Sequence, residues 1–237
     1  MRWNFAWIHG KFIKIVVSCG KEQLARNMLK KKIANPWKDV KLDDYENHMK
    51  LASVKQLQTM NEIMRDQFYR YEISSVMVLG VAGGNGLNHI VPDKFRVVYG
   101  VDINAAYLEE AQKRYPLLQR IFRPIQADLT DGSLILPQAD LVIANLLIEY
   151  IGYDNFQRTI GNTNPEYVSC IIQINLDDGF VSDSPYLHAF DHLGEVHHPI
   201  AESKLTEKMN EIGYKSVFRE QRPLPNGKEF LRLDYIR

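Results

Sequence analysis

The spacing of apolar residues changes along the chain and predicts two kinds of element. From residue 51 to residue 68 apolar side chains recur every three or four positions, which predicts an amphipathic helix. The polar stretch 43–48 before it holds residues that favour a helix start. After Tyr71 short apolar runs end in glycine or a polar residue, which is typical of buried parallel strands. Five such strands are expected, at residues 76–79, 95–101, 121–127, 140–144 and 168–174.

The last quarter of the chain departs from this pattern. Apolar residues between Ile200 and Ile212 predict a helix that Gly213 closes. Residues 214–219 and 230–236 are strand-like, and the Asn-Gly pair between them favours a turn joining antiparallel strands. The whole order predicts an α/β fold. We expect a Rossmann-like, mostly parallel seven-stranded sheet with helices on both faces and a C-terminal antiparallel hairpin.

Residues 1–20 differ from the rest because they are aromatic and basic and contain no acidic residue. They predict a short strand or a loosely docked arm; alternatively, Met28 is the native start. The run Lys30–Lys32 is interpreted as a solvated charge run. We therefore divide the chain into an N-terminal arm with cap helices, residues 1–70, and a ligand-binding domain, residues 71–237.

Composition narrows the class of protein. Of the 237 residues, 45% are hydrophobic and 24% are charged, which is ordinary for a globular chain. Lysine plus arginine (29) equals aspartate plus glutamate (29), which argues against a surface dedicated to nucleic acid. Cys19 and Cys170 form no closely spaced pair, so no disulfide framework is expected and a reducing cytoplasm is the predicted location. No run of apolar residues is long enough to predict a membrane span.

The residues that follow the predicted strands are the candidates for chemistry, because ligands of such sheets bind beyond the carboxyl ends of the strands. A glycine-rich turn, Gly80–Gly86, follows the first strand, and Asp102, Asp128 and Asn145 follow the next three. The turn lets backbone approach a ligand, and a helix expected from Leu87 would offer free N–H groups to an anion. Asp102 lies 22 positions after Gly80, close to the spacing of a carboxylate that binds ribose hydroxyls.

The glycine pattern does not match the dinucleotide fingerprint G-x-G-x-x-G. Read from Gly84, the pattern places His89 where the third glycine would allow close helix packing. Read from Gly80, it has Ala82 and Asn85 in place of the second and third glycines. We therefore rank a nicotinamide or flavin oxidoreductase below the alternatives that follow.

The strand ends in order resemble the class I S-adenosylmethionine (SAM)-dependent methyltransferases. Gly84 and Gly86 match two glycines of the family's first motif, G-x-G-x-G, and Ala82 replaces the other. Asp102 matches the acid at the end of the family's second strand, and Asp128 matches the polar residue after the third. Residues 140–145 match its fourth-strand motif, and the terminal hairpin matches its reversed seventh strand. The resemblance covers the chain from about Tyr71 to the end.

This resemblance implies SAM as the cofactor, with Asp102 on the ribose hydroxyls and Asp128 near the adenine amino group. The cofactor-binding residues that it implies are Gly80, Val81, Ala82, Gly84, Asn85, Gly86, Asp102, Ile103, Asp128, Leu129 and Asn145. It also implies methyl transfer by in-line displacement to an acceptor. A small molecule is the expected acceptor ahead of protein or RNA, and DNA is disfavoured because residues 145–148 lack a Pro-Pro-aromatic pattern.

Two departures from the family pattern motivate a rival hypothesis. Gly80 stands where the family has an acid, and Ala82 stands where it has glycine. The rival is a SAM-binding protein without turnover, acting as a sensor or partner subunit.

Candidates for a catalytic base lie just after the fourth strand and after the fifth. Glu149, Tyr150 and His188 are the candidates, with His192, His197 and His198 as further possibilities. Tyr45 and His48 are expected to close over the cofactor from the N-terminal side. His188 and His192 are four residues apart, but no carboxylate stands at a metal-ligand spacing, so no metal site is expected.

The assignment of Asp102 generates a first prediction. Asp102→Ala should weaken SAM binding by about 1–3 kcal/mol, because charge-assisted hydrogen bonds to the ribose are lost. Titration calorimetry with SAM measures the change. An unchanged affinity removes Asp102 from the site.

Overall fold

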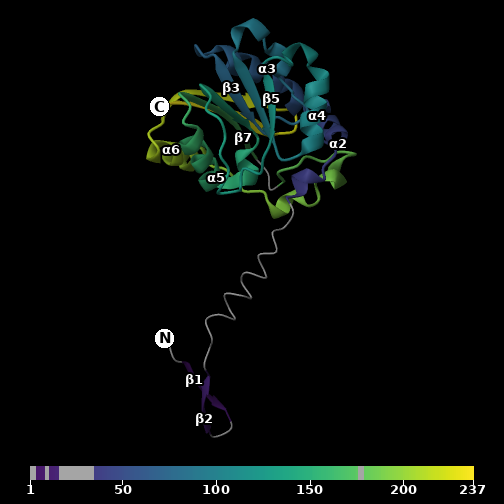
Figure 1. Cartoon of the computed structure of the whole chain (residues 1–237). Helices are drawn as coiled ribbons and strands as arrows, with labels where there is room; N and C mark the ends of the chain where they lie inside the picture. Colours follow the sequence, from purple (N-terminus) through teal and green to yellow (C-terminus); the bar gives the residue numbers. More distant parts are fainter. Residues whose placement is uncertain (1–3, 9–10, 16–34, 176–178) are drawn as a thin grey trace. The chain divides into compact units, whose positions relative to one another are not determined.

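The computed structural model describes residues 4–8, 11–15, 35–175 and 179–237 (Figure 1). By its contacts the chain divides into two units, Met1–Asn35 and Pro36–Arg237. In the first unit β1 (Asn4–Ile8) and β2 (Lys11–Ile15) pair antiparallel, with Ile8 opposite Lys11. Met28, Cys19 and the lysine run 30–32 lie outside the described residues.

The second unit is built on a seven-stranded sheet (Figure 1). Its strands are β3 (Ser75–Leu79), β4 (Val97–Asp102), β5 (Phe122–Gln126), β6 (Leu141–Asn145), β7 (Tyr167–Ile174), β8 (Lys215–Pro223) and β9 (Glu229–Ile236). The order across the sheet is β5-β4-β3-β6-β7-β9-β8. The first five strands in this order are parallel, and β9 enters antiparallel between β7 and β8. The predicted α/β sheet with a terminal antiparallel hairpin is confirmed.

Helices cover both faces of this sheet. They are α2 (Leu42–Lys50), α3 (Gln56–Tyr69), α4 (Ala105–Arg114), α5 (Ile148–Thr163) and α6 (Glu202–Glu211). Short 3-10 turns are η1 (Pro36–Lys38), η2 (Leu87–His89), η3 (Pro92–Lys94), η4 (Pro116–Leu118), η5 (Leu187–Phe190) and η6 (Leu193–Glu195). Alternate residues of β3 pack into different cores, because side chains of a strand point to opposite faces. Val76 packs with α3 and α4, and Met77 packs with α5 and α6.

The helix expected over residues 51–68 begins later than predicted, at Gln56. The polar stretch before it is itself a helix, α2, which the sequence analysis missed. Between the two helices the N–H groups of Val54 and Lys55 both donate to the Leu51 carbonyl, and Lys55 adopts a left-handed φ of 54°. Val54 is buried in this turn, so the apolar spacing continues through a segment that is not helical.

The helix expected from Leu87, after the glycine turn, does not form in this described segment. Only the 3-10 turns η2 and η3 follow. Gly86 has a φ of +89°, and Val91 precedes Pro92, which disfavours helical backbone at that residue. Helix α3, which precedes β3 in the chain, covers this face instead, and its Met64 side chain packs on Gly86.

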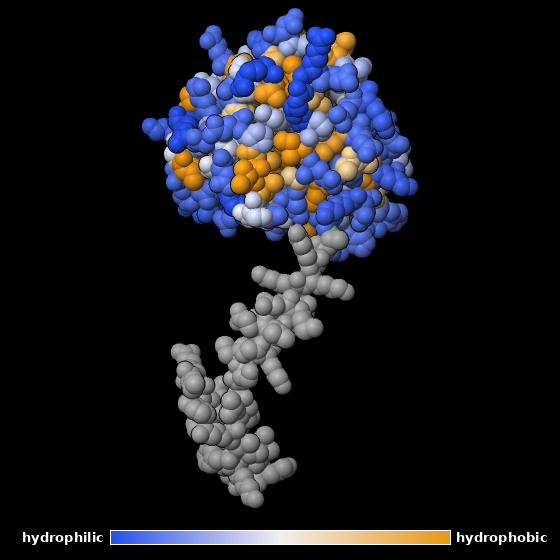
Figure 2. Space-filling model, viewed as in Figure 1, coloured by the Kyte–Doolittle hydropathy of each residue, from blue (hydrophilic) through white to orange (hydrophobic). Residues whose placement is uncertain are grey.

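The surface of the second unit agrees with its composition. On the face shown in Figure 2, hydrophilic side chains cover most of the surface and apolar residues lie between them, as is usual for a globular protein. Among the described helices, none has the length and apolar character needed to cross a membrane.

The glycine turn generates a prediction on stability. In Gly86→Ala, the new Cβ would lie 2.5 Å from the Met64 sulfur in a backbone conformation that side chains avoid. We expect a loss of about 1–3 kcal/mol in the free energy of unfolding, measured with urea. Gly161→Ala is the matched control, because its Cβ would meet nothing within 4 Å inside α5. The control should be neutral or stabilising by up to about 1 kcal/mol; equal effects in both variants would contradict the packing role of Gly86.

Candidate functional site

Two adjoining cavities lie at the carboxyl ends of β3, β4 and β6. The strand-end cavity has about 460 Å³ of empty space, its opening included, and the aromatic cavity has about 590 Å³. Four residues line both cavities: Trp37, Tyr45, Leu146 and Tyr150. The strand-end cavity is completed by Gly80, Ala82, Asp102, Tyr107, Asn145 and Leu147. The two spaces are therefore neighbours with common walls.

Asp102 is the acidic group of the strand-end cavity. Its Oδ2 accepts a hydrogen bond from the Ala82 N–H at 2.9 Å, and its Oδ1 accepts one from the Asn104 N–H at 2.9 Å. Burial raises the pKa of Asp102, and these backbone hydrogen bonds act in the opposite direction. Each carboxylate oxygen has a second lone pair, so Asp102 retains the capacity to accept from two hydroxyls of a ligand.

The two departures from the methyltransferase motif have a structural explanation. Gly80 has a φ of +68°, and a Cβ there would lie 3.2 Å from Cδ1 of Leu147. An acidic side chain at this position would therefore be strained and would press on Leu147. Ala82 also adopts a left-handed φ, of 47°, and its N–H is held by Asp102. The hydrogen bond to Asp102 thus offsets the backbone strain of an alanine in this left-handed conformation.

Asn145 is held in place by a buried polar network. Its carboxamide pairs with that of Gln67 through two hydrogen bonds, of 2.9 Å and 3.0 Å. Gln67 is fully buried on α3 and donates to Ser169 at 2.8 Å, and the Ser169 hydroxyl donates to Asp234. Gln67 was missed in the sequence analysis. A glutamine on the apolar side of a helix was the available signal.

Four of the residues predicted to bind cofactor thus meet in the strand-end cavity: Gly80, Ala82, Asp102 and Asn145. The others lie outside its walls: Val81, Gly84, Asn85, Gly86, Ile103, Asp128 and Leu129. Several of them have other contacts in the fold. Val81 and Leu129 are buried in the cores, and Asn85 donates to the Leu57 carbonyl. Asp128 accepts from the backbone and hydroxyl of Thr130 at 3.0 Å and 2.6 Å.

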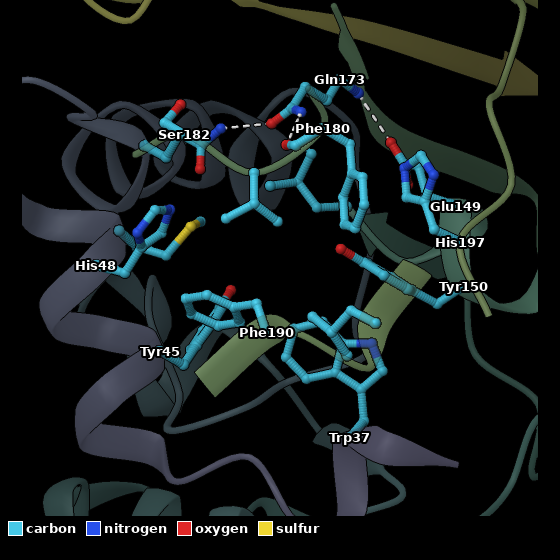
Figure 3. A pocket seen from close by; sticks show the side chains of 15 residues that line it. Trp37, Tyr45, His48, Glu149, Tyr150, Gln173, Phe180, Ser182, Phe190 and His197 are labelled. Atoms are coloured by element: carbon cyan, nitrogen blue, oxygen red, sulfur yellow. Dashed lines mark hydrogen bonds between the residues drawn. The ribbon is translucent and has the colours of Figure 1, made fainter. Parts of the chain in front are cut away.

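Glu149 is the buried acid of the aromatic cavity (Figure 3). It stands in the first turn of α5, and only 4% of the residue is exposed. Its Oε1 accepts a hydrogen bond from the Gln173 N–H at 2.8 Å. Within the described part of the chain, its Oε2 has no hydrogen-bond partner. Burial raises the pKa of Glu149 from 4.5 to about 7.

Aromatic rings form most of the remaining wall. Trp37 meets Tyr45 and Tyr150 edge to face, with ring centres 5.7 Å and 4.9 Å apart. Phe180 stacks on His197 with centres 4.1 Å apart, and His48 meets Phe190 at 5.0 Å. Burial lowers the pKa of His48 and of His197, so both rings are neutral near pH 7. Burial raises the pKa of Tyr45 and of Tyr150, which keeps both hydroxyls protonated.

The structure separates the candidate catalytic residues. Glu149, Tyr150 and His197 line the aromatic cavity, together with Tyr45 and His48 from α2. The other three histidines line neither cavity. The side chain of His188 is 94% exposed and pairs with Asp191 at 3.3 Å. His192 pairs with Glu195 at 3.0 Å on the surface, and among the described residues no cluster of potential metal ligands occurs.

Several walls of the aromatic cavity were not predicted from the sequence. Trp37 comes from η1, Phe180 from the segment after β7, and Phe190 from η5. These segments lack a periodic pattern, so their inward orientation depends on tertiary packing. Isolated aromatic residues in polar segments were the only available signal.

Comparisons with known proteins support the fold at low sequence identity. No family model and no curated protein matches the sequence. Magnesium protoporphyrin IX methyltransferase from Synechocystis PCC 6803, with bound SAM, aligns at a TM-score of 0.54 and 10% identity, over 94% of this chain and all of that chain. The methyltransferase domain of bacterial CtHen1-C aligns at 0.55 and 16% identity, over 76% and 96%. The [4+2]-cyclase SpnF aligns at 0.57 and 9% identity, over 76% and 80%.

The chain therefore has the fold of the class I SAM-dependent methyltransferases. This likeness confirms the architecture that the strand ends predict. It does not define the reaction, because one fold carries different activities.

The raised pKa of Glu149 generates a prediction on pH-dependent stability. A folded-state pKa of about 7 means that the fold favours the neutral carboxyl. That stabilisation is complete below about pH 4.5 and is lost as the pH rises through 7, by about 3 kcal/mol in all. Glu149→Gln lacks this titration. Its free energy of unfolding should therefore rise by about 3 kcal/mol relative to wild type between about pH 4.5 and pH 8.

Urea unfolding of both proteins at the two pH values measures this difference. A stability difference that does not change with pH would mean that Glu149 does not titrate with a raised pKa.

Proposed function

We propose that the protein is a SAM-dependent methyltransferase that methylates a small molecule bound in the aromatic cavity. One observation carries this proposal: two cavities share walls, and each contains one carboxyl group. Asp102 lines the strand-end cavity and can accept from the hydroxyls of a ribose, and the buried Glu149 lines the aromatic cavity. This arrangement provides separate places for cofactor and acceptor side by side. SAM, when bound, supplies a methyl group on a positively charged sulfur that is already a strong electrophile.

The residues of the strand-end cavity fit an adenosyl group. Asp102 faces the cavity with acceptor capacity for a ribose diol. The backbone of Gly80 and Ala82 forms a wall with little side-chain bulk. Trp37, Tyr45 and Tyr107 add aromatic surface on which a base or a sugar face can pack. The role of Asp128 at the adenine stays a prediction.

The residues of the aromatic cavity fit the requirements of methyl transfer. An in-line displacement needs the acceptor atom aligned near attack distance and water excluded, and the packed rings serve both needs. Glu149 has an Oε2 without a hydrogen-bond partner among the described residues and a pKa of about 7, which suits a general base that removes a proton from the acceptor. The Tyr150 hydroxyl, which stays protonated, is a donor on the wall between the two cavities.

A small acceptor fits the enclosure of this site. The aromatic cavity is lined mostly by apolar and aromatic side chains with a few polar groups, which is typical of small-molecule sites. Its walls include α2, which agrees with the proposal that residues before 71 act as a cap. The rival function, SAM binding without turnover, predicts no methylated product from any acceptor.

The proposal predicts different behaviour for the two carboxyl groups. Glu149→Gln should bind SAM as wild type does, because Glu149 lines only the aromatic cavity. Its rate of S-adenosylhomocysteine release with an acceptor should fall by about 10²–10⁴-fold. Asp102→Asn should instead weaken SAM binding, because Asp102 lines the strand-end cavity. Calorimetry with SAM and a product assay against an acceptor panel measure the two effects.

Glu207→Gln is the control variant, since Glu207 is an exposed glutamate on α6 that lines neither cavity. It should match wild type in both measurements. Binding of SAM with no release across a broad panel would favour the rival function. No SAM binding at all would overturn both.

A further inference from the structure

We propose that the acceptor is a cationic amine, an alkyl- or arylalkylammonium whose N–H group donates to Oε2 of Glu149. This inference rests on the proposed function for the role of the ligand as acceptor. The binding site itself is argued from the walls of the aromatic cavity alone.

The charge of the cavity is the first reason. Among its described lining residues Glu149 is the sole carboxyl group, and no lysine or arginine accompanies it. The two lining histidines do not supply a compensating charge, because burial lowers the pKa of each. His48 also uses Nδ1 in a hydrogen bond of 2.8 Å with Ser184. A buried carboxylate without a cation is costly, so a ligand that brings a positive charge gains from it.

The rings are the second reason. Five lining residues carry benzene or indole rings: Trp37, Tyr45, Tyr150, Phe180 and Phe190. Figure 3 shows them on several sides of the cavity, around the space that Glu149 adjoins. The face of such a ring is negative and attracts an ammonium group within about 6 Å of its centre. The faces of these rings do not attract a carboxylate or phosphate ligand in this way.

The remaining hydrogen-bonding groups are the third reason. The Gln173 side chain accepts from Gln56 at 2.5 Å and donates to Asn175 at 2.6 Å and to the Phe180 carbonyl at 2.8 Å. The side-chain amides of Gln56 and Gln173 are therefore already engaged with each other, with Asn175 and with the Phe180 carbonyl. Oε2 of Glu149 is left as the buried acceptor without a partner among the described residues. A single buried acceptor without a partner, on a residue that lines the cavity, matches one ligand N–H.

This contact also prepares the amine for reaction. The ammonium N–H bond breaks, its electron pair stays on nitrogen, and the proton forms an O–H bond at Oε2. The neutral carboxyl is a favoured state of the buried group, and nitrogen gains the lone pair that a nucleophile needs. No further reactant is required, and the proton returns to water when the ligand leaves.

Matched probes test the charge requirement directly. Benzylamine and cyclohexylamine are compared with benzyl alcohol and cyclohexanol by ligand-observed NMR titration of the full chain, without cofactor. Each amine should bind wild type at least about tenfold more tightly than its matched alcohol. Glu149→Gln should lower amine affinity by on the order of 30-fold and leave the alcohols nearly unchanged.

Phe180→Leu provides a second variant that does not remove the carboxyl. Phe180 lines only the aromatic cavity, and leucine retains apolar bulk. The variant should lower amine affinity by about threefold or more, with a smaller change for the alcohols. Thermal unfolding of each variant checks that it is folded. A variant that unfolds is replaced by Tyr150→Phe. This substitution removes the hydroxyl but keeps the ring, so the preference for amines over alcohols should be retained.

The outcomes separate this inference from the proposed function. Equal affinity for amines and alcohols, no amine binding, or an unchanged preference in Glu149→Gln would each overturn the amine site. SAM calorimetry is run in parallel. SAM binding without amine binding would overturn the inference and leave the methyltransferase proposal standing. Amine binding without SAM binding would overturn that proposal and the acceptor role, and would leave the amine-binding site standing.

Discussion

The register of the central parallel strands is the constraint on which the site depends. Val78 of β3 lies opposite Gly100 and Ile143, and Asp102 at the end of β4 lies opposite Gln126. Parallel strands in this register end at one edge of the sheet, so residues far apart in sequence meet there. Gly80, Asp102 and Asn145 reach the same cavity for this reason. A shift of register by one residue would move the side chains of Asp102 and Asn145 to the other face.

Two carboxyl groups at this edge differ because their surroundings differ. Asp102 accepts hydrogen bonds from backbone N–H groups at both oxygens, which partly offset the cost of its burial. Glu149 has one such hydrogen bond, and its other oxygen is buried without a partner among the described residues, so its neutral form is favoured. The first arrangement suits the fixed binding of hydroxyl groups, and the second suits a group that gains and loses a proton.

The glycine turn has a packing role in addition to any contact with a ligand. Cβ atoms at Gly84 and Gly86 would lie 2.7 Å from the Tyr115 ring and 2.5 Å from the Met64 sulfur. Helix α3 takes the place of the helix expected after the turn and brings Gln67 under Asn145. The same helix therefore closes the core and orients a residue of the cavity.

The sequence by itself determined the strands, their α/β order and the polar residues at strand ends, because buried strands need continuous apolar runs and end at turn residues. It also singled out Asp102, Asn145 and Glu149. Tertiary structure alone decided that α3 covers the glycine turn. It also brought Trp37, Phe180 and Phe190 around Glu149. Such contacts join segments without periodic patterns, and packing between distant parts of a chain leaves no local trace in the sequence.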